Sequence, residues 1–317
     1  MMPSIPTISV VVPTYMRSAL LADCLEGLRC QTRRPDEVVV VARSEDAATL
    51  AVVETERLRT ASPIRTVAPA SGGIVPAITA GLSSALGDVI AWTDDDAVPD
   101  FDWLLRIEQH FLVDDVVAVG GADYDPIDGL GRGGPSLENF GRLTWSGRLY
   151  GGMSEAICYV GPVGHLRGCN MAVRAPVPLP MEQLRGDGSG YEADICLQLA
   201  HRGKVLYDYR VRVAHRRAER VPEGDKLAMR PEVVGSLTSG TVDACYNLAL
   251  ILSRRIEGVR RVAVLLQILF IGQRSNPGLL HLMIRVCRCR NVESWRLAYE
   301  VMRVKRAGWR VGKRSRK

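Results

Sequence analysis

The stretch VVVPTYMRSALLADCLEGLRCQTRRPDEVVVV, from Val10 to Val41, carries the alternation on which the front half of the chain is built. Its first apolar, β-branched run stops at Pro13 and predicts a short buried strand. Leucines at helical spacing then follow Ser18, a residue type that caps helices, and predict a helix. The stretch closes with a second β-branched run over 37–41, so it predicts a strand, a helix and a strand in succession.

The same alternation continues further along the chain. Apolar runs at 64–67 and 88–93 predict two more strands, and segments 45–59 and 74–86 predict the helices that precede them. Strands that alternate with helices form a mostly parallel sheet with helices on both faces. We therefore expect an α/β fold in which ligands bind beyond the carboxyl ends of the strands.

Three aspartates, Asp94, Asp95 and Asp96, follow directly after the fourth of these apolar runs. Adjacent carboxylates repel one another, and this repulsion favours a cation bound between them. Carboxylate oxygens at a strand end suit Mg²⁺ or Mn²⁺, which proteins commonly share with substrate phosphates. No glycine-rich phosphate loop follows the first strand, so a phosphate-bearing substrate would be held mainly through the metal. A ribose contact and a solvated turn are the other interpretations of the triplet.

Composition and charge argue against long disorder and divide the chain in two. Hydrophobic residues make up 47% and charged residues 24% of the 317 residues, a normal globular balance. Residues 1–215 contain 19 basic and 27 acidic residues, whereas residues 216–317 contain 22 basic and 8 acidic residues. An acidic front part and a basic back part predict two regions with different partners.

Four blocks of sequence, in this order and spacing, resemble family-2 glycosyltransferases of the GT-A fold. The blocks are VVVPTYMRSALLADCLEGLRCQTRRPDEVVVV, GLSSALGDVIAWTDDDAVPD, LRGCNMAVR and YEADICLQLAHRGKVLYDYRVRVAH. They cover roughly residues 7–216. The resemblance implies a catalytic domain over residues 1–222 with a mostly parallel, nucleotide-diphospho-sugar transferase-like sheet. A C-terminal helical extension over 223–317 would follow it.

The resemblance also implies a metal site of the D-x-D type. In the family these aspartates hold a divalent ion and the ribose of a nucleotide-sugar donor. Carried over to this sequence, Asp94 and Asp95 would face the nucleotide, and Asp94 and Asp96 would bind Mn²⁺ or Mg²⁺. His215 stands where the family often has a further metal ligand, although a structural histidine is the equal alternative.

Further donor contacts are expected from this resemblance and from positions at strand ends. The residues are Pro13, Thr14, Tyr15, Arg17, Arg43, Asp46, Gly168 and Asn170. The chain departs from the family where the second strand ends, because Ala42 replaces the first acid of an acidic pair. Base recognition would then fall to Asp46, and Arg43 would meet the diphosphate. Asn170 would bond a sugar hydroxyl, with a plain turn before the next strand as the alternative.

Inverting sugar transfer needs a carboxylate that takes the proton from the acceptor hydroxyl. The segment from Gly190 opens a predicted helix and contains two carboxylates, Glu192 and Asp194. The resemblance places Glu192 at the position of the expected base, with Tyr191 in place of its usual acidic neighbour. Asp194 is the second candidate. An acidic first turn that stabilises the helix dipole is the structural alternative.

The back part alternates apolar runs, at 242–252, 262–271 and 279–286, with arginines. None of these runs has the roughly 20 residues that span a bilayer. The pattern fits a helical surface that lies on an anionic membrane, and it fits a homodimer interface almost as well. The basic tail from Arg303 also allows nucleic-acid binding, but no binding motif supports that partner.

The function that follows is a metal-dependent inverting glycosyltransferase that moves a sugar from a nucleotide-sugar donor to a hydroxyl. A glycan or lipid-linked sugar of cell-surface polysaccharide is the expected acceptor. A sugar-phosphate nucleotidyltransferase and an inactive GT-A-like scaffold are the alternatives. The chain opens without a basic segment followed by a long apolar one, so the expected location is the cytoplasm or the inner membrane face. The donor sugar, the base and the acceptor linkage stay open.

Overall fold

The computed structural model describes most of the chain, in six stretches. These are residues 5–129, 136–153, 157–216, 239–273, 276–289 and 292–314. The chain forms two compact units. The first contains Met1–Gly141, Tyr150–Pro180 and Ile195–Val221, and the second contains Arg142–Leu149, Met181–Asp194 and Pro222–Lys317.

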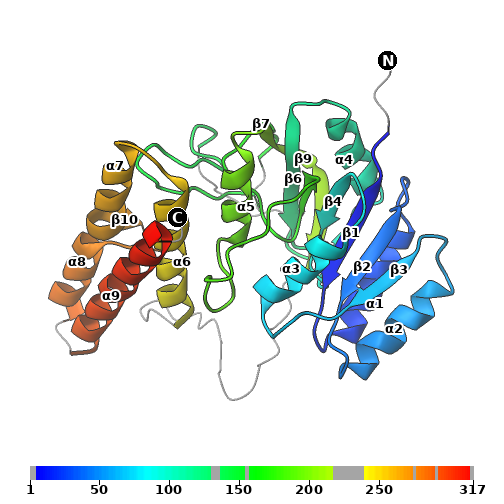
Figure 1. The fold of residues 1–317 in the computed structure, drawn as a ribbon, viewed down its shortest axis with the longest axis horizontal. Coiled ribbons are helices and arrows are strands. Elements are labelled where there is room, and N and C mark those ends of the chain that lie inside the picture. The colour runs from blue at the N-terminus through cyan, green and yellow to red at the C-terminus, as the bar shows by residue number, and fades with distance from the viewer. Residues whose placement is uncertain are drawn as a thin grey trace. The chain divides into compact units, whose positions relative to one another are not determined.

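The first unit is built on a single mixed sheet (Figure 1). Its strands are β1 (Ile8–Pro13), β2 (Glu37–Val41), β3 (Ile64–Val67), β4 (Val89–Trp92), β5 (Ala97–Pro99), β6 (Val116–Tyr124), β7 (Val160–Pro162), β8 (Met171–Arg174) and β9 (Lys204–His215). They follow the order β3-β2-β1-β4-β8-β6-β9-β5, and β7 pairs with β9. The four strands predicted from the front half pair in parallel, as does β6 with β9. The prediction of a mostly parallel sheet is confirmed.

Helices cover both faces of this sheet. They are α1 (Ser18–Arg29), α2 (Ala47–Arg57), α3 (Ile74–Ser84) and α4 (Trp103–Phe111). Side chains alternate between the faces of a strand. Val10 packs in one core with buried residues of α1, α2 and α4. Its neighbour Val11 points the other way, and a Cβ at Gly81 of α3 would lie only 2.3 Å from its Cγ1 atom.

An irregularity in β9 brings its backbone unusually close to β6. Gly121 pairs with Asp208, but the next residue, Ala122, pairs with Arg212, so β9 bulges between these two pairs. A Cβ atom at Gly121 would lie 1.9 Å from the carbonyl oxygen of Val211. Only glycine fits at this position.

The second unit is helical. From Ser239 onward its elements are α6 (Ser239–Arg255), α7 (Arg260–Leu266), the π-helix η1 (Gln267–Ile271), β10 (Gly272–Gln273), β11 (Asn276–Pro277), α8 (Leu279–Cys289) and α9 (Val292–Arg314). Helices α6 and α9 pack closely, since a Cβ atom at Gly308 would lie 2.4 Å from the carbonyl oxygen of Tyr246. The fully buried Lys305 of α9 donates through Nζ to the carbonyl oxygens of Ile268, Asn276 and Pro277.

The predicted domain boundary between residues 222 and 223 falls outside the described residues. The domain assignment therefore stays a prediction. The second unit also takes in Arg142–Leu149 and Met181–Asp194, two segments that the sequence assigns to the front domain. No helix in the described ranges combines the length and the apolar character needed to cross a membrane.

Candidate active site

Several of the polar residues singled out in the sequence gather at one edge of the sheet in the first unit. Strand β4 ends at Trp92, and the aspartates follow after Thr93. Because β8 runs antiparallel to β4, with Met171 opposite Trp92, the residues just before β8 lie at the same edge. Strands β6 and β9 are parallel and end together, with Tyr124 opposite Ala214. The end of β4, the start of β8 and the ends of β6 and β9 therefore all lie at this edge of the sheet.

His215 is the centre of this site. Its Nε2 atom lies 3.2 Å from Asp96 Oδ1 and 4.0 Å from Asp94 Oδ2. Strand β5 pairs Ala97 with His215, which fixes the histidine beside Asp96. His215 and Asp96 are buried, whereas Asp94 is partly exposed. The predicted metal ligands Asp94, Asp96 and His215 therefore lie together, and their ligand atoms all fall within 4.8 Å of one another.

A cation from the protein already balances part of the acidic cluster. Arg17 Nη1 lies 3.0 Å from Asp95 Oδ1 and 3.5 Å from Asp96 Oδ2. Arg17 precedes α1 and Asp95 is almost fully buried, so the pair joins the end of β1 to the end of β4. Arg17 was predicted as a donor contact, and here it compensates the charge of the aspartates.

Mutual repulsion and burial perturb the ionisation of the site. Burial, together with the charge of Asp96, raises the pKa of Asp94 to about 6. Burial alone would lower the pKa of His215, but the facing carboxylates of Asp123 and Asp96 outweigh it and raise the pKa to about 12. The imidazole is therefore cationic in the metal-free site and stands among carboxylates. A metal ion at Nε2 would take the place of a proton.

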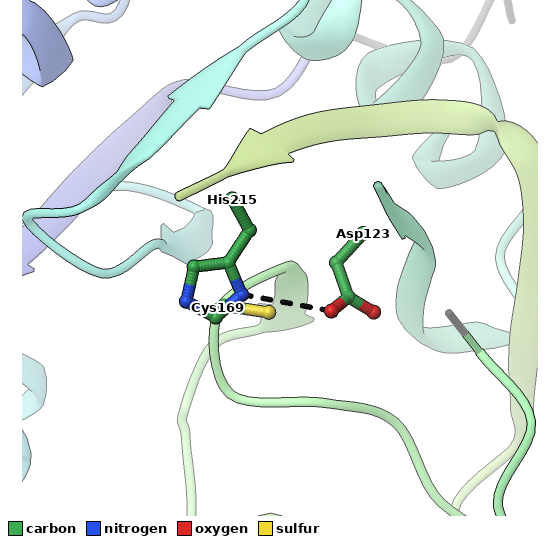
Figure 2. A group of neighbouring side chains, drawn as sticks. All are labelled: Asp123, Cys169 and His215. Atoms are coloured by element: carbon green, nitrogen blue, oxygen red, sulfur yellow. Dashed lines mark ion pairs between the residues drawn. The ribbon is translucent and has the colours of Figure 1, made fainter. Parts of the chain in front are cut away.

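The opposite side of the imidazole faces a second group of side chains (Figure 2). His215 Nδ1 lies 3.5 Å from Oδ2 of Asp123, the residue before the end of β6. Cys169, just ahead of β8, completes a buried Asp–Cys–His cluster. Burial raises the pKa of the Cys169 thiol to about 11, so the sulfur is protonated. The sequence reasoning missed Asp123, although an apolar run precedes it, as one precedes Asp94.

The Asp94, Asp96 and His215 group fits a divalent ion. An octahedral ion with bonds of about 2.1 Å places neighbouring ligand atoms about 3 Å apart. The separation of 3.2 Å between Asp96 and His215 already matches that spacing, and the 4.0 Å to Asp94 needs only a small adjustment. Two carboxylates and one imidazole leave further positions open for a substrate.

Two of the predicted donor contacts stack at the strand ends. The Arg43 guanidinium lies 4.0 Å from the ring centroid of Tyr15. A planar cation held on an aromatic face is suited to an anionic group such as a diphosphate. Asp46 has another use, because it accepts hydrogen bonds from the backbone N–H groups of Met16 and Thr49 and so caps α2. Its role toward the nucleotide base stays a prediction.

Asn170 is fully buried, and the structure gives its amide three partners. Oδ1 accepts from Trp103 Nε1 at 2.8 Å, and Nδ2 donates to the carbonyl oxygens of Ala122 and Val211. The last two carbonyls flank the bulge between β6 and β9. This geometry favours the structural alternative for Asn170. Gly168 lies in the turn before Asn170, and its contact with the donor stays a prediction.

The two candidate bases differ in their surroundings within the second unit. Both lie in the first turn of α5 (Tyr191–Leu199). Asp194 is fully buried, accepts from Arg255 Nε at 2.6 Å and also accepts from the backbone N–H of Met181. Glu192 is only half-buried. Asp194 thus has a clear structural role, whereas Glu192 remains accessible to solvent.

Comparison with solved structures identifies the fold. The structure is similar to that of the mannosyltransferase PcManGT from Pyrobaculum calidifontis, in complex with GDP-Man and Mn²⁺. The sequence identity is 15% and the TM-score 0.55, over 99% of this chain and 87% of that chain. Residues 1–349 of S. aureus TarS match with 16% identity and a TM-score of 0.51, over 98% and 90% of the two chains.

A third similar structure is that of GalNAc-T7 with UDP, GalNAc and Mn²⁺, at 16% identity and a TM-score of 0.54. The match covers 79% of this chain and 49% of that chain. A comparison with curated proteins finds no match to the sequence. At these identities the likeness shows the fold, which is the GT-A fold of glycosyltransferases. The family model for glycosyl transferase family 2 matches residues 9–169, and the chain belongs to that family.

Proposed function

We propose that this protein is a metal-dependent, inverting glycosyltransferase that uses a nucleotide-sugar donor. The observation that carries the proposal is the convergence of Asp94, Asp96 and His215 at the carboxyl edge of a GT-A sheet. Membership of glycosyl transferase family 2 supports the same class of reaction. The proposed acceptor is a hydroxyl of a glycan or of a lipid-linked sugar in cell-surface polysaccharide synthesis.

Asp94, Asp96 and His215 would hold the divalent ion, whose chemistry is to neutralise charge that develops on the leaving diphosphate. We favour Mn²⁺ over Mg²⁺, because an imidazole nitrogen is a poor ligand for the harder Mg²⁺ ion. Solved structures of two similar proteins contain Mn²⁺. Arg43, held on Tyr15, is proposed to contact the diphosphate. Asp95 and Asp46 are proposed to face the nucleotide.

Glu192 is proposed as the base that takes the proton from the acceptor hydroxyl. The support is its half-buried position in the first turn of α5, compared with the full burial of the competing carboxylate in an ion pair. Asp194 already accepts hydrogen bonds from Arg255 Nε and from the backbone N–H of Met181. A carboxylate confined by an arginine is a poor proton acceptor for an incoming substrate.

The proposed enzyme works at a membrane surface, through an apolar face of the second unit. On α7 and η1 the side chains of Val262, Leu266 and Phe270 are each at least 45% exposed, and on α8 so are those of Leu280 and Ile284. They recur at helical spacing and so form one stripe on each helix. The start of α8 lies beside the end of η1, where His281 Nδ1 lies 2.6 Å from the carbonyl oxygen of Ile271.

Charge favours an anionic membrane as the occupant of this face. Residues 254–290 contain eight arginines and one acidic residue, Glu257. A segment with this net positive charge beside an exposed apolar stripe attracts acidic lipid headgroups, whereas two copies of so basic a segment would repel each other. The proposed location is the cytoplasmic face of the membrane.

Vesicle binding tests this part of the proposal. The double variant Phe270→Glu and Leu280→Glu is expected to lose sedimentation with anionic vesicles, which the wild type retains. The matched control is Leu58→Glu, an exposed leucine at the end of α2 in the first unit. Wild-type protein that ignores anionic vesicles but forms a dimer, disrupted by the double variant, would instead assign the face to a second copy.

Donor binding tests the central proposal. Calorimetry and thermal shift would scan UDP-, GDP- and dTDP-sugars with and without Mn²⁺, for the wild type and Asp96→Ala. We expect one donor to stabilise the wild type only when Mn²⁺ is present, and Asp96→Ala to lose the effect. A folded wild type that binds no donor under either condition would support an inactive scaffold.

The reaction product separates the proposed enzyme from the nucleotidyltransferase alternative. A glycosyltransferase releases a nucleoside diphosphate from the donor. When water is the acceptor, it also releases the free sugar. A nucleotidyltransferase releases pyrophosphate. Coupled assays for the two products on the same sample would decide between these reactions, and pyrophosphate alone would overturn the proposal.

A further inference from the structure

The Nδ1 side of His215 is left without a hydrogen bond by the described residues around it. The atom is buried and makes no hydrogen bond of normal geometry. The nearest acidic atom is Asp123 Oδ2, at 3.5 Å, and Figure 2 shows the carboxylate pointing toward this nitrogen. A buried, unsatisfied ring nitrogen is costly, so the contact with Asp123 calls for an explanation.

The backbone fixes Asp123 in this place. Asp123 pairs with Val213 across the parallel ladder of β6 and β9. Since side chains two residues apart share a face, His215 projects on the same side of the sheet as Val213 and Asp123. Asp123 is 0% exposed. Its other oxygen, Oδ1, lies 3.5 Å from Arg167 Nε, so the two oxygens face different partners.

We propose that Asp123 is a positioning residue for the metal site. Its carboxylate would accept a hydrogen bond from Nδ1–H of His215 when the imidazole is neutral, and so leave the lone pair of Nε2 directed at Asp94 and Asp96. This inference rests on the proposed function, because it requires a metal held by those three residues. Carboxylates that orient metal-binding histidines in this manner commonly change metal affinity by about 10- to 100-fold.

Asp123 suits this task better than its neighbour Cys169. A thiol is a weak hydrogen-bond partner, and Cys169 lies in the turn before β8 rather than on a paired strand. The carboxylate, in contrast, is held by the β6–β9 ladder and is a strong hydrogen-bond acceptor. The Asp123–Cys169–His215 cluster therefore acts as support for the metal site rather than as a site of its own.

Mn²⁺ titration of the full-length protein tests the proposal. Calorimetry is expected to give a Kd about 10- to 100-fold weaker for Asp123→Asn than for the wild type. The matched control is Asp208→Asn, because Asp208 is equally buried and bonds to His110 Nε2 at 2.9 Å, away from the metal ligands. Asp208→Asn is expected to lower the melting temperature but to keep the wild-type Kd for Mn²⁺.

The tautomer of His215 gives a readout that needs no variant at Asp123. In the wild type loaded with diamagnetic Zn²⁺ in place of Mn²⁺, nitrogen–proton correlation spectra of the imidazole should place the proton on Nδ1. A proton on Nε2 would overturn the proposal, even if Asp123→Asn fails to fold. So would a Kd for Mn²⁺ that Cys169→Ser weakens and Asp123→Asn does not. A wild type that binds no Mn²⁺ would refute the proposed function instead.

Discussion

Asp194 Oδ1 accepts a hydrogen bond from Arg255 Nε at 2.6 Å inside the second unit, and the carboxylate is fully buried. Burial raises the pKa of Asp194 in spite of this bond. The pair therefore ties the first turn of α5 to the end of α6 at the expense of desolvating two charges. Asp194 therefore has a structural role in the second unit.

Substitution of the two acids of α5 should separate stability from catalysis. Asp194→Asn is expected to cost about 3 to 5 kcal/mol, because it leaves Arg255 without its buried partner. Glu192→Gln should keep the wild-type melting temperature and lower kcat by about 10²- to 10⁴-fold. Thermal denaturation and steady-state kinetics measure the two effects. A stable, inactive Asp194→Asn would move the base to Asp194.

Asn170→Ala should be a folding variant rather than a binding variant. It would leave Trp103 Nε1 and two bulge carbonyls without partners, at a cost of about 1 to 3 kcal/mol for each buried group. The expected result is a strong loss of melting temperature, with an unchanged KM for the donor in the fraction that folds. A normal melting temperature with a raised KM would restore the contact with the donor sugar.

Asp208 should give the protein an acid-sensitive contribution to stability. Burial alone would raise its pKa, but hydrogen bonds from His110 and Arg210 hold the pKa well below its ordinary value. Such a group stabilises the fold above its unfolded-state pKa, near 4, and loses the contribution as pH falls toward its folded-state pKa. The loss is on the order of 2 kcal/mol.

Urea denaturation across pH 2 to 7, a range of about five units around the unfolded-state pKa, would measure that loss. Asp208→Asn should be less stable at neutral pH and should show a flatter acid limb. The control is Asp115→Asn, which removes an exposed pair with Lys204 and should leave the curve unchanged. An acid limb that is equally steep in Asp208→Asn and the wild type would contradict the prediction.

Gly121→Ala should disrupt the pairing of β6 with β9. The new Cβ would meet the carbonyl oxygens of Val211 at 1.9 Å and Asp208 at 2.4 Å, and backbone atoms have little freedom to move aside. We expect a loss of more than about 3 kcal/mol, the upper end for overpacking. Gly151→Ala, with no atom within 4 Å of the added Cβ, is the control and should be nearly neutral.

Strands β1 to β4 could be predicted because each has a clear local sequence pattern. The runs that became β1 to β4 are apolar, β-branched and separated by helical spacing, so period and length agree. Strand β5, by contrast, has only three residues, Ala97–Pro99, and follows the aspartates directly. Its pairing with β9 depends on contacts more than a hundred residues apart, which no local pattern encodes.

The candidate site also has one part that could be predicted from the sequence and one part that could not. Strand ends and the family resemblance predicted Asp94, Asp96 and His215 as one metal site, and the three side chains do lie close together; their role as metal ligands stays a prediction. The arginine partners of the acidic residues could not be predicted, because they are distant in sequence. Arg255 is 61 residues from Asp194, and Arg17 is 78 residues from Asp95. Asp123 carried a usable signal, because it ends an apolar run as Asp94 does. The roles assigned to the other donor contacts stay predictions.

The carbonyl cage around Lys305 makes this lysine a natural reporter of the second unit. Burial lowers the pKa of Lys305 to about 8, so its amine would react readily with acylating reagents if they could reach it. All three of its hydrogens instead point at Ile268, Asn276 and Pro277. Acylation and tryptic cleavage at this one lysine would therefore begin only when α9 comes away from its neighbours. A mass spectrum can follow the opening of this helix in the unmodified protein.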